Sequence, residues 1–161
     1  MSQPDLHTFI CEQAKALGFD QVAILPFEAA KQALDEAGVS LQAWLSKGYH
    51  ADMAWMAENA YKRSDPRYLF NSVASVLCVT LNYYTPDPDD YRQPQTLKIA
   101  KYARSRDYHK RIKKKLNQLL KTLQAIEPTL QGRAITDSAP LLEKALAVRA
   151  GFGWQGKHSN I

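Results

Sequence analysis

The chain has 161 residues, of which 45% are hydrophobic and 23% are charged, and its formal net charge is +5. These values are typical of one globular domain and exclude a collagen-like, repetitive or low-complexity protein. The longest apolar stretch, VASVLCVTL, is far shorter than a membrane-spanning helix, and MSQPDLHTF does not resemble a signal peptide, so we expect a cytoplasmic protein with no membrane partner.

The first half of the chain predicts several helices and one short strand. Residues 5–17 have apolar side chains at helical spacing, and Gly18 follows them as a residue that commonly ends a helix. QVAIL at 21–25 is predicted to be a strand. Further helical patterns, before a polar loop at 63–70, occupy 28–36 (ended by Gly38), 41–50 and 52–59.

The second half contains the clearest strand and the clearest helix. VASVLCVTLNYY at 73–84 is apolar and rich in β-branched residues, as a buried strand is. Residues 108–126 form an apolar stripe with Lys and Arg on the opposite face. The other predictions are a surface loop at 85–95, a strand or turn at 98–103, a strand at 133–137 and a helix from Pro140 to Gly151. This order predicts an α/β (α+β) fold, a central sheet covered by helices.

The positive charge is concentrated in residues 98–121, which contain ten Lys and Arg and a single acid, Asp107. This region has a net charge of +9, so the rest of the chain sums to −4. A solvated helix face is the usual explanation of such a region. A binding surface for a polyanion is the alternative, and its affinity would depend strongly on salt.

The two cysteines, Cys11 and Cys78, are predicted to be free thiols in apolar surroundings. The chain has no CxxC pair, and His109 has no partner at the spacing of metal ligands. We therefore expect no metal site within this chain.

TDSAP at 136–140 places Asp137 where a predicted strand meets a predicted helix. A carboxylate there commonly accepts hydrogen bonds from the first N–H groups of the helix. It can also act as a general acid at the carboxyl end of a strand, where α/β proteins usually hold ligands. Both roles remain open on these residues alone.

ARSRDYHK at 103–110 brings charged and aromatic residues together just before the basic helix. One explanation is a loop in which Asp107 caps the helix. The other is the rim of a ligand site, where arginine and histidine contact phosphate and Tyr108 stacks on the ligand.

GFGWQGKHSN, near the end of the chain, contains three glycines. Gly151 is explained as the residue that ends the preceding helix, whereas Gly153 and Gly156 are not. Glycine permits close approach of a ligand to the backbone, and Lys157 could hold an anionic or amide-rich group. The spacing matches neither a P-loop nor a dinucleotide-binding fingerprint.

Five stretches, taken together and in order, resemble the N-terminal half of epoxyqueuosine reductase. They are GYHADMAWM, RSDPRYL, the strand that runs into LNYY, KIAKYARSRDYHK and TDSAPLLEKALAVRAGFGWQGKH. The resemblance extends from about residue 5 to residue 161. It implies a bacterial, cytoplasmic oxidoreductase of queuosine biosynthesis, which reduces epoxyqueuosine to queuosine at the wobble position of tRNA with cobalamin and two 4Fe–4S iron–sulfur clusters.

The same resemblance implies a sheet covered by helices that holds the cobalamin, as in reductive dehalogenases and B12-processing proteins. It implies that Asp137 is the proton donor and lies near the cofactor. The other residues expected near the corrin ring or its amides are Arg63, Tyr102, Trp154, Gly156, Lys157, His158 and Ser159. The basic region supplies the candidates for contact with tRNA: Arg104, Arg106, Tyr108, His109, Lys110, Lys113 and Lys114.

The family continues with a ferredoxin-like region that holds the clusters and with helical repeats that help to bind tRNA; neither is present in these 161 residues. We therefore expect one cobalamin-binding-type domain, 1–161, incomplete at its C-terminus and inactive or nearly so alone. A separately encoded C-terminal half is a possible partner. The alternatives are a freestanding corrinoid- or tRNA-binding module and a non-functional fragment. Since the family's next strand would follow Ile161, we also expect marginal stability or oligomerisation.

Overall fold

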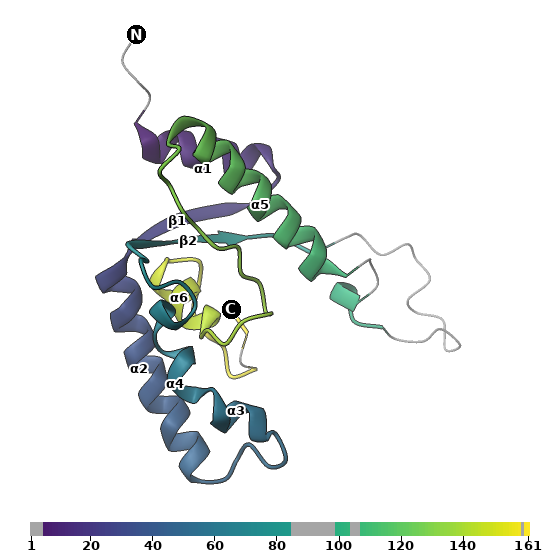
Figure 1. The fold of residues 1–161 in the computed structure, drawn as a ribbon. Coiled ribbons are helices and arrows are strands. Elements are labelled where there is room, and N and C mark those ends of the chain that lie inside the picture. The colour runs from purple at the N-terminus through teal and green to yellow at the C-terminus, as the bar shows by residue number, and fades with distance from the viewer. Residues whose placement is uncertain (1–4, 85–98, 104–106, 159) are drawn as a thin grey trace, which may run out of the picture.

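The structure is a computed structural model that describes residues 5–84, 99–103, 107–158 and 160–161. Its elements follow the chain from the N-terminus, purple in Figure 1, to the C-terminus, yellow. They are α1 (Leu6–Ala16), β1 (Gln21–Pro26), α2 (Phe27–Ser46), α3 (Ala54–Glu58), α4 (Ala60–Arg63), η1 (Pro66–Tyr68), β2 (Ser75–Thr80), η3 (Lys101–Ala103), α5 (Tyr108–Ile126) and α6 (Glu143–Arg149).

The sheet of the described residues consists of β1 and β2, which pair in antiparallel register from Gln21 opposite Thr80 to Pro26 opposite Ser75. Helices lie on both sides of it, α1 and α5 on one and α2, α4 and α6 on the other (Figure 1). The predicted α/β class is confirmed at this level, as a mixed fold with six α-helices and a small sheet among the described residues.

Strand alternation decides which helices each face of the sheet contacts, because successive side chains point to opposite faces. Toward α1 and α5 the strands present Val22, Ile24, Leu77 and Val79. Toward α2 and α6 they present Leu25, Val76 and Cys78. Each face therefore has its own hydrophobic cluster, and neither face is left to solvent.

Each cluster contains one large side chain that is almost fully buried. Leu119 of α5 is 1% exposed beside Ile10 and Phe19, and Leu34 of α2 is 0% exposed beside Leu146 of α6. Complete burial of a leucine side chain stabilises a fold by about 1.5–3 kcal/mol. These contacts fix α5 on one face of the sheet and α6 on the other.

The helix over 108–126 is confirmed with both of its predicted ends. Asp107 is the N-cap, and one of its carboxylate oxygens accepts a hydrogen bond from the backbone N–H of His109 at 3.0 Å. This cap satisfies one of the N–H groups that the first helical turn leaves without a partner. Gly18, after α1, has the expected left-handed backbone, with φ of +80°.

The predicted break at Gly38 is wrong, because α2 continues through it to Ser46. A glycine inside a helix costs about 1 kcal/mol relative to alanine. Here a β-carbon on Gly38 would lie 2.9 Å from the β-carbon of Ser64, just after α4. Glycine therefore allows α4 to approach α2 closely. The predicted helix over 52–59 is reduced to the five residues of α3.

The predicted strand over 133–137 is also wrong. Gly132 lies against Leu120 of α5, and the Arg133 side chain donates a hydrogen bond from Nη1 to the carbonyl of Leu69 at 2.8 Å. Asp137 has φ of +45°, which is incompatible with a strand. These residues belong to a crossing segment, 127–142, that leads from α5 to α6 on the other side of the sheet (Figure 1).

Three further predictions differ in extent or are only partly described. The last helix begins at Glu143 rather than at Pro140. Residues 101–103 form a turn of 3-10 helix, so the turn rather than the strand is found there. The predicted loop at 85–95 lies entirely outside the described residues. Over the described ranges, no helix has the length and apolar character needed to span a membrane.

Candidate functional site

The first turn of α5 and the crossing segment meet at Asp137. The Tyr108 hydroxyl donates a hydrogen bond to Oδ2 of Asp137 at 2.6 Å. The Nε2 atom of His109 lies 3.8 Å from the same oxygen. The structure therefore brings together three residues that the sequence analysis proposed for two different roles.

The His109 ring is held from its other side. Its Nδ1 lies 2.8 Å from Oδ1 of Asp107, and its ring stacks on that of Tyr108 with centroids 4.0 Å apart. The interaction with His109 lowers the pKa of Asp107, which is therefore a carboxylate at neutral pH and can only accept. The Nδ1 atom consequently holds the proton, and Nε2 is the atom directed at Asp137.

Asp137 is the main cause of a raised pKa at Tyr108. Its hydrogen bond, burial of the ring and the nearby negative charge raise the pKa of Tyr108 to about 12. Tyr108 thus keeps its proton and remains a donor at neutral pH. Tyr102 lies edge-on to the same ring, with centroids 6.4 Å apart, and its own side chain is exposed.

Glu143, the first residue of α6, is a member of the site that the sequence analysis missed. Its Oε1 accepts a hydrogen bond from the backbone N–H of Asp137 at 3.0 Å. Burial, and then the negative charge of Asp137, raise the pKa of Glu143 to about 7. The sequence feature that could have indicated Glu143 is its place as an acidic residue in the first turn of the predicted helix, six positions after Asp137.

Arg63 lies at the end of α4, on the same side of the sheet as α6. Its Nε is buried and has no hydrogen-bond partner among the described residues, and its guanidinium lies 5.3 Å from the Trp55 ring. The Arg63 carbonyl accepts a hydrogen bond from the backbone N–H of Leu142 at 3.2 Å. Arg63 is therefore tied to the crossing segment just before Glu143.

The glycine-rich stretch starts at the far end of α6. Gly151 ends the helix with φ of +77°, and the Trp154 side chain is 81% exposed. The backbone N–H of Gly156 donates to the carbonyl of Asn160 at 2.8 Å, and a β-carbon on Gly156 would lie 2.9 Å from the His158 ring. A side chain at 156 would require the exposed His158 ring to move.

The remaining predicted residues fall into two groups. Lys157 is exposed in the turn of the glycine-rich stretch. Ser159, Arg104 and Arg106 lie outside the described residues.

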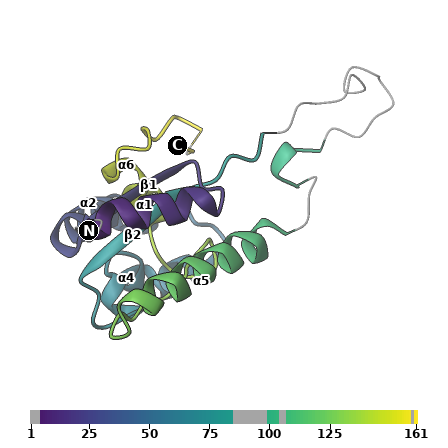
Figure 2. The same cartoon turned by 90° about the horizontal axis from the view of Figure 1, so that it is seen from above.

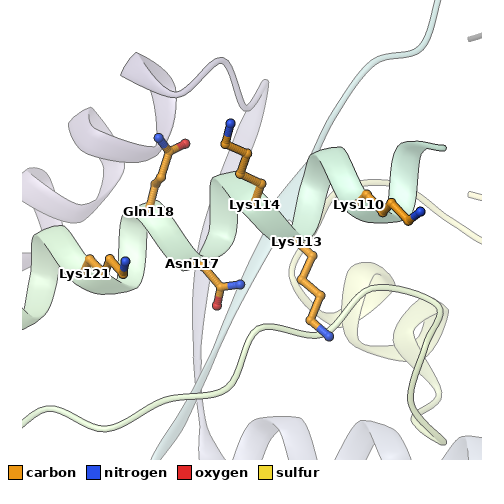
Figure 3. Close-up of a pocket in the computed structure, with 6 residues that line it drawn as sticks. All are labelled: Lys110, Lys113, Lys114, Asn117, Gln118 and Lys121. Carbon is orange, nitrogen blue, oxygen red and sulfur yellow. The ribbon is translucent and has the colours of Figure 1, made fainter. Parts of the chain in front are cut away.

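The basic side chains of α5 border an open hollow of about 580 Å³. Lys114 and Gln118 extend to one side of the helix, and Lys113 and Asn117 to the other (Figure 3). Seen from above, α5 lies at the edge of the fold (Figure 2), and the side chains that border the hollow are exposed. The hollow is lined by Lys110, Lys113, Lys114, Asn117, Gln118 and Lys121, which we call the basic face.

The donor set of the site is not that of a metal centre. Among the described residues no group of three or more His, Cys, Asp or Glu side chains could hold a metal ion. Burial raises the pKa of Cys78, a residue of β2, to about 11, so this thiol stays protonated. The site offers instead a carboxyl, a phenol and an imidazole within reach of one another, an arrangement suited to proton transfer.

Comparison with known families shows what the chain is similar to. Residues 63–138, which span Arg63, the basic region and Asp137, match the family model described as "Epoxyqueuosine reductase QueG, DUF1730". No solved structure matches the fold.

Individual relatives extend the similarity to the whole chain. An epoxyqueuosine reductase of Cyclobacterium marinum is 43% identical over 160 residues, 99% of this chain and 50% of the relative. That of Pseudomonas aeruginosa is 40% identical over 170 residues, 100% of this chain and 45% of the relative. The chain is thus homologous to the epoxyqueuosine reductases along its whole length, and it spans about half the length of the curated relatives it matches.

The raised pKa of Glu143 predicts a dependence of stability on pH. Between the usual value of 4.5 and about 7, the folded chain keeps a proton that the unfolded chain has lost. The free energy of unfolding therefore falls as the pH rises through this window, by roughly 2–3 kcal/mol for this group, and levels off above pH 7. Glu143→Gln should remove this contribution, as measured by urea unfolding at pH 5 and pH 8.

The matched control is Glu12→Gln on the exposed surface of α1, which should keep the pH dependence of the unchanged chain. A Glu143→Gln chain with the same pH dependence as the unchanged chain would contradict the burial of an ionisable Glu143.

Proposed function

We propose that this chain is the cobalamin-binding part of an epoxyqueuosine reductase, and that Asp137 is its proton donor. The observation on which the proposal rests is the placement of the Asp137 carboxyl between the Tyr108 hydroxyl and the His109 imidazole. The homology to epoxyqueuosine reductases supplies the reaction class. The finer resemblance, to the cobalamin domains of reductive dehalogenases and B12-processing proteins, is part of this proposal.

The residues near the site are compatible with a large, flat cofactor rich in amides. Arg63 offers a buried Nε with no protein partner among the described residues, as a donor that awaits an acceptor would. Trp154 and Tyr102 expose aromatic surface that a macrocycle can cover. Lys157, His158 and Ser159 complete the proposed cofactor contacts. When bound, cobalamin supplies a strongly nucleophilic reduced metal centre.

The side chains of this chain would supply the proton chemistry. Reduction of an epoxide breaks a C–O bond, and the oxygen that is released needs a proton, which Asp137 would donate. Tyr108 fixes the direction of the Asp137 carboxyl, and the Nε2 atom of His109, once it has taken a proton from solvent, would lie where it can pass that proton to Asp137. Asp107 keeps the His109 ring turned toward Asp137.

We further propose that the substrate is a tRNA, that the reaction takes place in the cytoplasm and that the electrons come from two 4Fe–4S clusters. Such clusters would reside in a region that this half does not span, in the same polypeptide or in a separately encoded partner. The basic face is the proposed contact for tRNA phosphates because its lysines lie on the outer surface of α5.

Cobalamin binding is the first prediction. The purified chain, mixed with cobalamin and freed of excess by gel filtration, should show corrin absorbance on the protein peak. Trp154→Ala and Lys157→Ala should each lower the affinity about tenfold, since each removes one contact worth on the order of 1 kcal/mol. Lys47→Ala, an exposed lysine after α2, is the control and should bind like the unchanged chain. A colourless peak of folded protein would contradict the proposed cofactor site.

Proton donation by Asp137 is tested with a small water-soluble epoxide. Chemically reduced cobalamin on the chain makes this step independent of clusters and tRNA. Asp137→Asn should slow epoxide consumption by on the order of 10²-fold, because asparagine keeps the shape but has no acidic proton. The unchanged rate in that variant, with cobalamin still bound, would assign the proton to another group.

Binding of tRNA by the basic face predicts a salt dependence. A chain with Lys113→Ala and Lys114→Ala should bind tRNA at least tenfold more weakly at low salt. The slope of log affinity against log salt should fall by about 1–2, since each lost phosphate contact lowers it by about 0.7–0.9. Fluorescence anisotropy measures both, with Lys47→Ala as the control. Equal slopes in all three chains would exclude α5 as the contact.

Tight, salt-sensitive tRNA binding without cobalamin binding would favour the second candidate function, a freestanding tRNA-binding module. The observation that favours this candidate is the basic face itself, because its six lining residues all come from one exposed helix.

A further inference from the structure

The backbone of Asp137 has a conformation that few residues other than glycine adopt, although aspartate tolerates it better than most. Its φ of +45° lies in the left-handed region, which glycine adopts freely and other residues only rarely. Such a conformation persists where neighbouring contacts impose it. The side chain of Asp137 is 54% exposed, so packing around the carboxyl does not impose it.

The contact that can impose this conformation comes from Glu143. The backbone N–H of Asp137 donates to Oε1 of Glu143 at 3.0 Å, across six positions of the chain. The direction of that N–H depends on the backbone torsions at Asp137, and these torsions also set where the Asp137 side chain projects. A fixed acceptor for the N–H therefore fixes the direction in which the Asp137 side chain leaves the backbone.

Glu143 is itself in a fixed position. It is half-buried at the start of α6, and Leu146, one turn later, is 3% exposed against α2 and the sheet. The preceding residue, Leu142, donates its backbone N–H to the Arg63 carbonyl of α4 at 3.2 Å. The backbone of Glu143 is thus held in place by the buried Leu146 on one side and by the hydrogen bond of Leu142 on the other.

We propose that Glu143 is a positioning residue, which holds the backbone of Asp137 so that its carboxyl reaches the Tyr108 hydroxyl. This inference rests on the proposed role of Asp137 and assigns Glu143 no contact with substrate or cofactor. It links α6, on one side of the sheet, to the first turn of α5, on the other.

The ionisation of Glu143 adjusts this link. The groups that face it are Asp137, His109 of α5 and Cys78 of β2, whereas Arg149 of α6 donates to Gln32 of α2. Since burial raises the pKa of Glu143 to about 7, its charge changes close to neutral pH. The ionised form accepts the stronger hydrogen bond from the Asp137 N–H.

Two substitutions separate positioning from a general effect on the fold. Glu143→Gln keeps an Oε1 acceptor, whereas Glu143→Leu has a similar size and no acceptor. A role limited to helix α6 or to packing would change thermal stability without changing the contact between Asp137 and Tyr108.

The contact is read by nuclear magnetic resonance on the 161-residue chain. Hydrogen exchange of the Asp137 amide reports the bond to Glu143, and the Cζ resonance of Tyr108, assigned with Tyr108→Phe, reports the bond to Asp137. In Glu143→Leu we expect Asp137 amide exchange at least tenfold faster and a Tyr108 resonance shifted to its value in Asp137→Ala. In Glu143→Gln both should stay close to the unchanged chain.

An unchanged Tyr108 resonance in a folded Glu143→Leu chain would overturn the proposal. If Glu143→Leu does not fold, a pH titration of the unchanged chain tests the proposal instead. The chemical shift of the Asp137 amide should change near pH 7 in the unchanged chain and should not do so in Glu143→Gln. The His109 ring is followed through its own resonances as a control. Absence of that titration would also overturn the proposal. None of these readings uses cobalamin or an epoxide, so they stand apart from the tests of Asp137 as proton donor.

Discussion

The pairing of β1 with β2 is the constraint on which the rest of the structure depends. Because two short strands have both faces covered, their alternate side chains assign α1 and α5 to one face and α2 and α6 to the other. The chain must then pass from α5 to α6 around the sheet, and the crossing segment does so. The candidate site lies where this segment meets the first turn of α5. Its two halves therefore come from opposite sides of the sheet, 29 positions apart in the chain at Tyr108 and Asp137.

The charged and polar groups of the site come from different elements, which the fold brings together at this place. Two acids, Asp137 and Glu143, come from the crossing segment and α6, while the phenol and the imidazole come from α5. The negative charge of Asp137 adds to the burial that raises the pKa of Glu143, and the hydrogen bond to Asp137 is the largest cause of the raised pKa of Tyr108. Glu143 and Tyr108 therefore both hold their protons more firmly than the free side chains do.

The sequence correctly predicted those helices and strands whose faces and ends are determined by residues close to one another in the chain. The helix over 108–126 was found because its apolar stripe, its Asp107 cap and Pro128 all agree. The strand at 73–84 was found in its central part, since β-branched residues dominate it. The break at Gly38 was wrong because the reason for that glycine is the approach of Ser64, a residue 26 positions away. The strand at 133–137 was wrong because its letters suit a strand, yet Asp137 has a left-handed backbone and its N–H bonds to the side chain of Glu143 rather than to another strand.

The site was predictable residue by residue but not as an arrangement. Asp137, Tyr108 and His109 stood out by type and place, and the resemblance to a family added their expected roles. Glu143 did not stand out, because a glutamate in the first turn of a helix has an ordinary explanation in the helix dipole. The positive φ of Asp137 and the hydrogen bond from its N–H to Glu143 are seen only in the structure, and they are the reason to propose that Glu143 positions Asp137.

The left-handed backbone at Asp137 also bears on how this chain can change over generations. Apart from glycine, the residues that adopt this region most readily are asparagine and aspartate. If Asp137 is the proton donor proposed above, its replacement by asparagine would remove the acidic proton, and asparagine also tolerates this backbone conformation. A lineage under no demand for the chemistry would meet little resistance to that change, and it would retain a well-folded protein in which the loss of function shows only at this one side chain.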